Sequence, residues 1–524
     1  MKVAVAQLNY TVGDFETNKV KIIGAINKAK EQGSDLVVFA EHAISGSPAY
    51  DLLNKVDFLE LCEESLVEIA SFCEGISAIV GLPVQNGNRI YSAAALIQNR
   101  KIIHYITKRN IYLRDEQRFI SSGKGSEYFL IKGNKVAVVL GDGLLNEEEY
   151  SGKVHSVVNI SADPYARAII EKRYERMKRQ SFTLDANYIF VNQVGGQTDV
   201  VFDGSSAVFN PRGEAVAFLK SFEEDFLIID VDEDHPEIEL PYQNKTENVY
   251  KAIKLGLGDF FSKQGYKTAC LGLSGGIDSA VVAAIAAEVL GPENVKVLMM
   301  PSPYSSDHSV DDAVDMAERI GLGYMIVPIN DSYDAVLRAL EPVFNKDVEF
   351  GTAEENIQAR LRMVMLMAMS NKFGHILLNT SNKSELAVGY GTLYGDNTGV
   401  ISIMGDLYKS EVFDLARYIN REIEVIPQSI IMKEPSAELR PGQKDTDTLP
   451  AYDVVDAIFY RMIEERQSRE EIINAGFDAE VVYKIYGMIL KNEQKRFQFC
   501  PVLRVSTCPF GVERIMPLTS KYGF

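Results

Sequence analysis

The stretch Ser274-Gly275-Gly276-Ile277-Asp278-Ser279 decides the fold of the second half of this chain. It follows an apolar, strand-like run at residues 268–273 and opens an apolar, helical run at residues 280–287. A strand, a glycine-rich turn and a helix start in this order make an anion site, because the glycines let the backbone approach a phosphate and the helix N-terminus adds positive charge. The stretch therefore predicts a phosphate loop.

Side chains of the same loop refine this prediction. Ser274 and Ser279 can donate hydrogen bonds, whereas Asp278 would repel a bare phosphate and so indicates a bridging cation, most simply Mg²⁺. No lysine follows the glycines, so the loop is not of the Walker type. An ordinary glycine-rich turn would explain the glycines but not the serines and the aspartate beside them. We therefore favour the phosphate site.

Composition limits the partners of the chain. Its 524 residues are too many for one core, so we expect two or three domains. It carries 54 Lys and Arg against 73 Asp and Glu, a formal net charge of −19, which disfavours nucleic acid and anionic membranes as main partners. Five cysteines without CxxC spacing indicate neither a disulfide framework nor a zinc site. With no signal peptide and no apolar run of membrane-span length, we expect a cytoplasmic protein.

Strand and helix patterns divide the chain into two halves. The first half alternates short β-branched runs with amphipathic helical runs and ends in hairpin-like strands between residues 198 and 230. An acidic segment with two prolines follows, and we place a linker at residues 236–246, between a domain of residues 1–235 and one of residues 247–524. The second half repeats a strand–helix alternation, which predicts a doubly wound parallel sheet with ligands at the carboxyl ends of its strands.

Polar clusters follow several strands of the predicted parallel sheet. Lys, Ser, Thr and Glu concentrated at strand exits suit phosphates and a metal. Any one cluster could be an ordinary polar loop, but their coincidence at one sheet edge indicates a site. The clusters are residues 300–306, 379–385, 389–396, 435–440 and 445–447.

The phosphate loop resembles the signature of ATP pyrophosphatases, which release pyrophosphate from ATP while adenylating an oxygen. That superfamily includes GMP, asparagine and argininosuccinate synthetases and tRNA-thiolating enzymes, so the loop alone does not select a substrate. The later motifs resemble those of NAD synthetases, and the resemblance covers essentially all of the second half. These motifs are residues 379–396, Tyr408-Lys409-Ser410, residues 435–449 and the ending at residues 492–496.

This resemblance implies amidation of nicotinic acid adenine dinucleotide. The carboxylate of that substrate attacks the α-phosphorus of ATP, which gives an acyl-adenylate and pyrophosphate, and ammonia then displaces AMP to form NAD. Mg²⁺ and cationic side chains are needed to stabilise charge on the leaving pyrophosphate. The implied partners are the dinucleotide, ATP and ammonia, and the resemblance also implies a homodimer or a higher homo-oligomer.

The motifs carry residue roles to the second half. The implied catalytic residues are Asp278, Lys409 and Asp396, and the implied Mg²⁺ ligands are Asp278 and Glu385. Other residues are implied to contact ATP, pyrophosphate, the adenylate or the dinucleotide: Ser274, Gly275, Gly276, Ser279, Arg360, Thr380, Ser410 and Lys495. Lys383, beside Glu385, is interpreted as a member of an ion pair rather than as a catalyst.

The first half resembles the nitrilase-type amidase domain, an αββα sandwich that is fused to NAD synthetase in its glutamine-using form. That domain uses a Glu base, a Lys and a Cys nucleophile. Residues 39–53 match the segment of the base, with Glu41 in its place, and residues 106–119 match the segment of the Lys, with Lys108. Residues 191–197 and 202–206 match as well.

The nucleophile segment does not match. After the strand predicted at residues 136–140, where the family has Cys-Glu-Asp, this chain reads Gly141-Asp142-Gly143. Glycine cannot form a thioester, and no cysteine lies nearby in the sequence. We interpret the first half as a degenerate glutaminase in which Glu41 and Lys108 remain, and we expect the synthetase to use free ammonia.

Three alternatives stay open. The chain could hydrolyse glutamine with an unrecognised nucleophile, or it could be a non-catalytic nucleotide-binding protein. It could also be a tRNA-modifying member of the superfamily, which the acidic charge balance disfavours.

Overall fold

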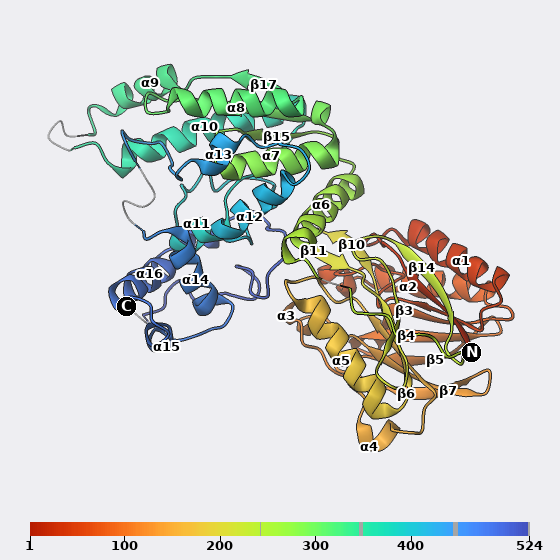
Figure 1. The fold of residues 1–524 in the computed structure, drawn as a ribbon. Helices are drawn as coiled ribbons and strands as arrows, with labels where there is room; N and C mark the ends of the chain where they lie inside the picture. Colours follow the sequence, from red (N-terminus) through yellow and green to blue (C-terminus); the bar gives the residue numbers. More distant parts are fainter. Residues whose placement is uncertain (242, 345–348, 444–448, 522–524) are drawn as a thin grey trace. The chain divides into compact units, whose positions relative to one another are not determined.

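The computed structural model describes residues 1–241, 243–344, 349–443 and 449–521. Contacts divide the chain into two compact units, Met1–Lys245 and Thr246–Phe524, shown in Figure 1. The described residues between 235 and 244 carry no helix or strand. The linker bounds of 236 and 246 stay a prediction. Among the described residues, no helix has the length and apolar character needed to cross a membrane.

Two six-stranded sheets form the framework of unit 1. In the first sheet, β1–β3 run parallel and the outer strands antiparallel. Its order is β14 (Asp225–Asp230), β1 (Lys2–Gln7), β2 (Leu36–Phe39), β3 (Ser77–Asn86), β4 (Arg89–Gln98) and β5 (Lys101–Thr107). The second sheet has the order β13 (Ala215–Phe218), β12 (Ala207–Phe209), β9 (Asn187–Asn192), β8 (Ser156–Ser161), β7 (Asn134–Leu140) and β6 (Glu127–Ile131). A separate hairpin joins β10 (Val194–Gln197) and β11 (Val200–Asp203).

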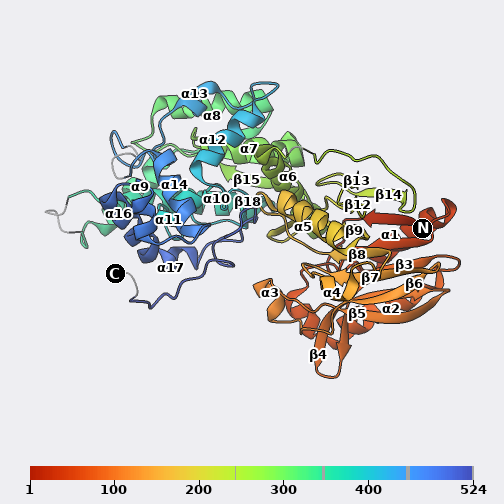
Figure 2. The ribbon, with the colours of Figure 1, turned by 60° about the horizontal axis from the view of Figure 1, so that its bottom comes forward.

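Alternation along the strands builds the layers of unit 1. Val3 and Val5 of β1 point into one buried cluster with Val136 and Val158 of the second sheet, so the two sheets pack face to face. The intervening residues of β1 and β2 pack on α1 (Phe15–Glu31) and α2 (Val56–Ser71). On the second sheet, α5 (Ile169–Leu184) contacts β9 and β12 (Figure 2). This αββα order confirms the fold class predicted for the first half.

Short helical segments complete unit 1 at its loops. They are η1 (Tyr50–Asn54), α3 (Arg114–Gln117) and α4 (Glu147–Tyr150). The sequence patterns did not single out α2, α5, β5 or β6.

Unit 2 contains a five-stranded sheet whose neighbouring strands, among the described residues, all pair in parallel. Its order is β17 (Gly323–Ile326), β16 (Val295–Met299), β15 (Ala269–Gly272), β18 (Ile376–Asn379) and β19 (Ile401–Ser402). Sequence order reverses between β15 and β18, because β16 and β17 lie on one side of β15 and the later strands on the other. In parallel sheets ligands bind at such a switch point, at the carboxyl ends of the strands.

Helices cover both faces of this sheet. Cys270, Leu298 and Leu377 pack with Met363 and Leu366 of α10 (Thr352–Phe373). Because side chains alternate along a strand, the intervening residues of β15 and β16 face the other side, where α7 (Ile277–Leu290) packs. The sequence of α7 is apolar all round, as expected of an enclosed helix. The doubly wound parallel sheet predicted for the second half is confirmed.

The remaining helices of unit 2 flank the sheet or form a second core. Helices α11, α14, α15 and α16 share a buried apolar cluster of their own. Its helices are α11 (Lys383–Val388), α14 (Tyr452–Ile463), α15 (Arg469–Asn474) and α16 (Ala479–Lys491). The other helices are α6 (Lys245–Gln264), η2 (Pro292–Asn294), α8 (Asp307–Ile320), α9 (Asn330–Leu340), α12 (Lys409–Ile419), α13 (Gln428–Met432) and α17 (Glu493–Arg496).

Candidate active site

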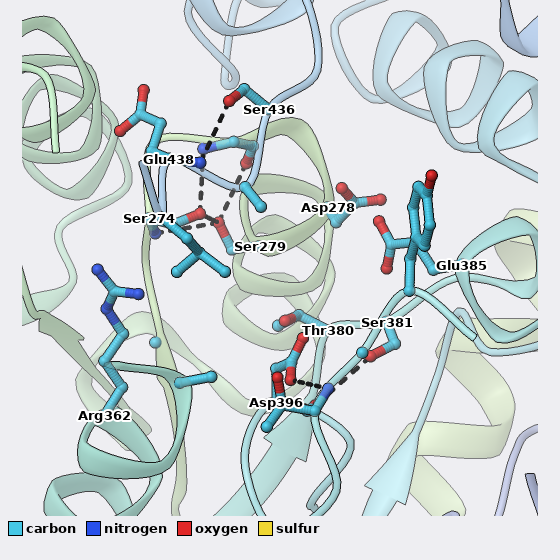
Figure 3. A pocket seen from close by; sticks show the side chains of 18 of the residues that line it. Ser274, Asp278, Ser279, Arg362, Thr380, Ser381, Glu385, Asp396, Ser436 and Glu438 are labelled. Atoms are coloured by element: carbon cyan, nitrogen blue, oxygen red, sulfur yellow. Dashed lines mark hydrogen bonds between the residues drawn. The ribbon is translucent and has the colours of Figure 1, made fainter. Parts of the chain in front are cut away.

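A cavity of about 900 Å³ opens at the switch point of the parallel sheet in unit 2. The ends of β15, β16 and β18 contribute to its walls, together with the start of α7 and a loop around Glu438 (Figure 3). Nine residues predicted for the site line it: Ser274, Gly276, Asp278, Ser279, Thr380, Glu385, Asp396, Lys409 and Lys495. The motifs that lie far apart in the sequence therefore converge on one space.

The loop between β15 and α7 has the geometry of an anion cradle. The backbone of Gly275 has a φ of +75°, and a Cβ there would lie 2.1 Å from the carbonyl oxygen of Ser309, so only glycine fits. Ser274 Oγ lies 3.1 Å from Ser279 Oγ and accepts a hydrogen bond from the Gly276 amide at 3.2 Å. Gly276 caps α7 without a side-chain hydrogen bond, which leaves the start of the helix to a ligand.

The carboxylates of Asp278 and Glu385 face one ammonium. Lys409, the first residue of α12, forms an ion pair with Asp278 Oδ2, and its Nζ lies 3.5 Å from Glu385 Oε1. The Lys409 side chain is 4% exposed, against 18% and 22% for the two carboxylate side chains. The Asn382 amide donates to Asp278 Oδ1 at 2.9 Å. Three elements, α7, α11 and α12, thus bring these charges together.

Asp396 and Lys495 lie on the β18 side of the cavity. Asp396 Oδ1 accepts a hydrogen bond from the Thr392 amide at 2.6 Å, and the Asp396 carbonyl accepts one from Asn379 Nδ2 at 2.8 Å. Lys495 Nζ donates to the carbonyl oxygens of Gly389 and Gly391 at 2.7 and 2.8 Å. Burial lowers the pKa of Lys495, while the charge of Asp396 opposes this shift.

Three residues predicted for the site do not line the cavity. Gly275 is a buried residue of the phosphate loop, and its positive φ permits the turn. Arg360 is exposed, and its Nε donates to the Leu393 carbonyl at 3.2 Å. The Ser410 amide donates to Asp456 Oδ2 at 2.8 Å. Ligand contacts of these residues stay a prediction.

The sequence motifs missed several residues that line the cavity. Arg362 extends from α10 toward it, and its Nε donates to the Met300 carbonyl at 3.0 Å (Figure 3). Glu438 accepts hydrogen bonds from Ser309 Oγ at 2.7 Å and from Lys433 Nζ at 2.9 Å. Pro435–Glu438 belongs to a motif that the sequence did single out, whereas nothing in the local pattern distinguished Arg362. Residues 445–447, the last polar cluster, lie outside the described residues.

Lys383 is held as a structural cation. Its side chain is fully buried, and its Nζ lies 2.8 Å from Asp406 Oδ1 and 2.6 Å from Glu464 Oε1. A buried charge is stable when opposite charges and hydrogen bonds surround it, as here. The geometry agrees with the interpretation of Lys383 as part of an ion pair.

A second polar cluster lies in unit 1, at the ends of β2, β5 and β7. Lys108 Nζ lies 3.1 Å from Glu41 Oε1 and 2.9 Å from Glu116 Oε1, and Ser92 Oγ donates to Glu41 at 2.5 Å. Burial opposes the charge of Lys108, but the two carboxylates outweigh burial and raise its pKa. Burial raises the pKa of Glu116 to about 7, against the opposing charge of Lys108.

Gly141 adjoins this cluster. A Cβ built on Gly141 would lie 2.7 Å from Lys108 Cε, 2.9 Å from Lys108 Nζ and 3.5 Å from Glu41 Oε2. The three positions matched to the amidase family therefore meet in space, and the Lys108 side chain fills the place where a nucleophile would begin. The five cysteines are all free, and they lie in α2, directly after it, in β15 and near the C-terminal end of unit 2.

Comparison with known proteins agrees with both halves of the chain. A model of the NAD synthase family matches residues 249–498, and a model of carbon-nitrogen hydrolases matches residues 2–163. A glutamine-dependent NAD(+) synthetase from Synechocystis is 41% identical over 99% of each chain. One from Thermotoga maritima is 37% identical over 100% of this chain and 99% of the relative.

A solved structure extends the likeness to three dimensions. The glutamine-dependent NAD+ synthetase from Acinetobacter baumannii in complex with ADP superposes with a TM-score of 0.77, at 35% identity, over 99% of this chain and 98% of that one. The fold and the site thus define a two-domain protein with a nitrilase-like unit and an ATP-using synthetase unit. The chain belongs to the family of two-domain NAD synthetases, enzymes that take ATP as a substrate.

Proposed function

We propose that the cavity of unit 2 is the place where the carboxylate of nicotinic acid adenine dinucleotide is adenylated and then amidated. The observation that carries this proposal is the convergence of a phosphate loop and two carboxylates, Asp278 and Glu385, on one wall of the cavity. A phosphate loop beside two carboxylates suits a nucleoside triphosphate with its metal, because the loop binds the phosphates and the carboxylates bind the cation.

Asp278 and Glu385 are the residues that would hold Mg²⁺. They fit, because carboxylate oxygens are preferred Mg²⁺ ligands and because these two already share one positive charge, the ammonium of Lys409. When bound, Mg²⁺ supplies neutralisation of the charge that develops on pyrophosphate. Removal of divalent cations with EDTA should abolish pyrophosphate release, and Mg²⁺ should restore it. Undiminished release in EDTA would refute this assignment.

The loop residues orient the phosphates. The hydroxyls of Ser274 and Ser279, which bond to each other in this structure, can turn to donate to phosphate oxygens. The first amides of α7 lack a side-chain cap and can donate to a phosphate as well. Thr380, at the end of β18, lies across the switch point and can donate to the nucleotide. Lys409 supplies positive charge toward the phosphates, and Asp396 with Lys495 forms the wall on which the dinucleotide would lie.

For the nitrogen source, we propose ammonia rather than glutamine. Amide hydrolysis by this domain type needs a thiolate that attacks the amide carbon and forms a thioester. Gly141 offers no side chain, and the ammonium end of Lys108 lies where that side chain would start. Ammonia would then reach the acyl-adenylate from solution or from another protein, and unit 1 would act as a scaffold.

The names of the relatives favour a second candidate, in which this chain also hydrolyses glutamine. The proteins from Synechocystis and Thermotoga maritima are both named glutamine-dependent and align over nearly the whole chain. That candidate needs a nucleophile other than the residue at position 141. Glutamine and ammonium offered separately to the purified protein discriminate the two candidates. The ammonia proposal expects NAD only with ammonium, and NAD formed from glutamine alone would overturn it.

Two further expectations belong to this proposal. The family resemblance supports a homodimer or a higher homo-oligomer, which light scattering of the purified protein tests. A cytoplasmic location is supported by the five free cysteines and by the need for ATP.

A further inference from the structure

The Lys409 ammonium stands between the two carboxylates assigned to the metal. Its Nζ pairs with Asp278 Oδ2 and lies 3.5 Å from Glu385 Oε1, and all three residues line the same cavity. The ammonium thus contacts an oxygen of each carboxylate that is assigned to the metal. The ammonium and a divalent cation would therefore bind the same two carboxylates.

The backbone of Lys409 is fixed, whereas its ammonium is the end of a flexible chain. The Lys409 amide donates to Ser384 Oγ at 2.9 Å, and the next amide donates to Asp456, so the start of α12 is anchored to α11 and α14. The Lys409 ammonium lies over the Tyr452 ring, 5.6 Å from its centroid. A change of partner at this position requires rotation of the side chain alone.

Charge balance shows when such a rotation is favourable. With the ammonium in place, the two carboxylates keep one net negative charge, which attracts a divalent cation only weakly because one carboxylate is already paired. A divalent cation in place of the ammonium releases a positive charge inside the cavity, beside the phosphate loop. That released charge is stabilised only when phosphate oxygens arrive to receive it.

We propose that Lys409 and the divalent cation compete for Asp278 and Glu385, so that metal binds tightly only together with the nucleotide phosphates, to which Lys409 then turns. Lys409 thus acts as a counterion in the empty site and as a phosphate ligand in the filled one. This inference rests on the proposed metal role of the two carboxylates.

Direct metal binding tests the competition without any turnover. Mn²⁺, which is visible by electron paramagnetic resonance, is titrated into the full-length protein without nucleotide. The Lys409→Met variant should bind Mn²⁺ about tenfold more tightly than the wild type, a coupling within the usual range. Lys409→Gln keeps a polar side chain of similar length and should show the same gain, and circular dichroism verifies that each variant is folded.

A matched control separates competition from general electrostatics. Lys433 lines the same cavity, but its ammonium pairs with Glu438 at 2.9 Å. Lys433→Met removes the same charge from the cavity and should change Mn²⁺ affinity by less than about twofold. An equal gain in the Lys409 and Lys433 variants, or no gain in either Lys409 variant, overturns the competition.

A double variant distinguishes failure of this inference from failure of the metal assignment. Asp278→Asn combined with Lys409→Met should lose the tight Mn²⁺ site. If the double variant binds Mn²⁺ as tightly as Lys409→Met alone, the metal lies elsewhere, and both the assignment and the competition are wrong. If Asp278→Asn weakens Mn²⁺ binding in the presence of an α,β-methylene ATP analogue but Lys409→Met gains nothing without nucleotide, only the competition is wrong.

Discussion

Each unit of the molecule holds a lysine between two carboxylates, and the two clusters differ in what surrounds them. In unit 1, Lys108 lies between Glu41 and Glu116 and covers the backbone of Gly141. In unit 2, Lys409 lies between Asp278 and Glu385 on the wall of a cavity of about 900 Å³. The charges are arranged alike, and the ammonium of Lys409 lines a cavity into which it can turn.

The difference shows what a cluster of charges needs to do chemistry. In unit 1 the carboxylates and the lysine satisfy one another beside Gly141, which carries no side chain that could attack a substrate. In unit 2 the same kind of cluster adjoins a phosphate loop at a topological switch point, where a ligand enters. A cluster of a lysine and two carboxylates therefore does not by itself identify a ligand site, because its surroundings differ between the two units.

The largest expected difference between the two clusters is in the rate of NAD synthesis after one carboxylate is removed from each. Asp278→Asn should lower the ammonia-dependent rate by about 10³-fold, or about 4 kcal/mol of transition-state stabilisation. Glu41→Gln should leave that rate within about twofold, because unit 1 then contributes no chemistry. Release of pyrophosphate and formation of NAD, followed together, give both numbers. A collapse of the ammonia-dependent rate in Glu41→Gln would contradict the account.

Although Glu41→Gln should leave NAD synthesis nearly unchanged, it should lower the stability of unit 1. Glu41→Gln leaves the buried ammonium of Lys108 with one carboxylate instead of two, and we expect unfolding to become easier by about 3 kcal/mol. Urea unfolding followed by circular dichroism measures the change. Glu68→Gln is the matched control, since that carboxylate pairs with Lys19 at 2.7 Å and is half exposed. An equal, small effect of both variants would show that the buried cluster carries little stability.

Restoring the missing thiol should not restore the glutaminase. Gly141 has a φ of +58°, and a new Cβ would displace Lys108, so Gly141→Cys should destabilise the protein by about 1–2 kcal/mol. It should release no glutamate from glutamine above the wild-type background, because the cysteine must expel a lysine that two carboxylates hold. Gly141→Ala carries the same strain without a thiol and serves as the control. Rapid glutamate release by Gly141→Cys would show that the pocket is still intact.

A pH dependence of stability should arise from Glu116. Burial raises its pKa to about 7 from its ordinary value of 4.5, so the folded state binds a proton that the unfolded state releases between these values. Stability is then fully present below about pH 4.5 and declines as pH rises through about 7. The decline should exceed that of Glu116→Gln by about 2–3 kcal/mol, because each pKa unit of the shift corresponds to about 1.4 kcal/mol. Urea unfolding at about pH 5 and about pH 8 measures the free energy of unfolding of each protein. An equal change between the two pH values in both proteins would refute the shift of the Glu116 pKa.

The sequence predicted the fold class and much of the cavity because both depend on local signals. The phosphate loop joins a strand to a helix within a few residues, and Asp278 lies inside it. Glu385 and Lys409 belong to motifs that begin α11 and α12, so their neighbourhood was recognisable as well. Each of these positions follows from where a strand ends or a helix starts.

The rest depended on packing that no local pattern reveals. Arg360 and Arg362 are two residues apart on α10 and so face different directions, and only the sheet beneath the helix determines that Arg362 faces the cavity. Glu438 meets Ser306 and Ser309 across more than a hundred residues of sequence. The sequence singled out Gly141, but only the fold shows that the end of the Lys108 side chain lies against it.

We propose that unit 2 alone performs the chemistry and that no nitrogen passes through unit 1. The origin of the nitrogen in the product tests this proposal. The full-length protein is given amide-¹⁵N glutamine and unlabelled ammonium together with ATP, Mg²⁺ and nicotinic acid adenine dinucleotide, and the NAD formed is analysed by mass spectrometry. The account predicts a carboxamide without ¹⁵N above natural abundance, since Gly141 offers no nucleophile to release the label. NAD enriched in ¹⁵N would contradict it.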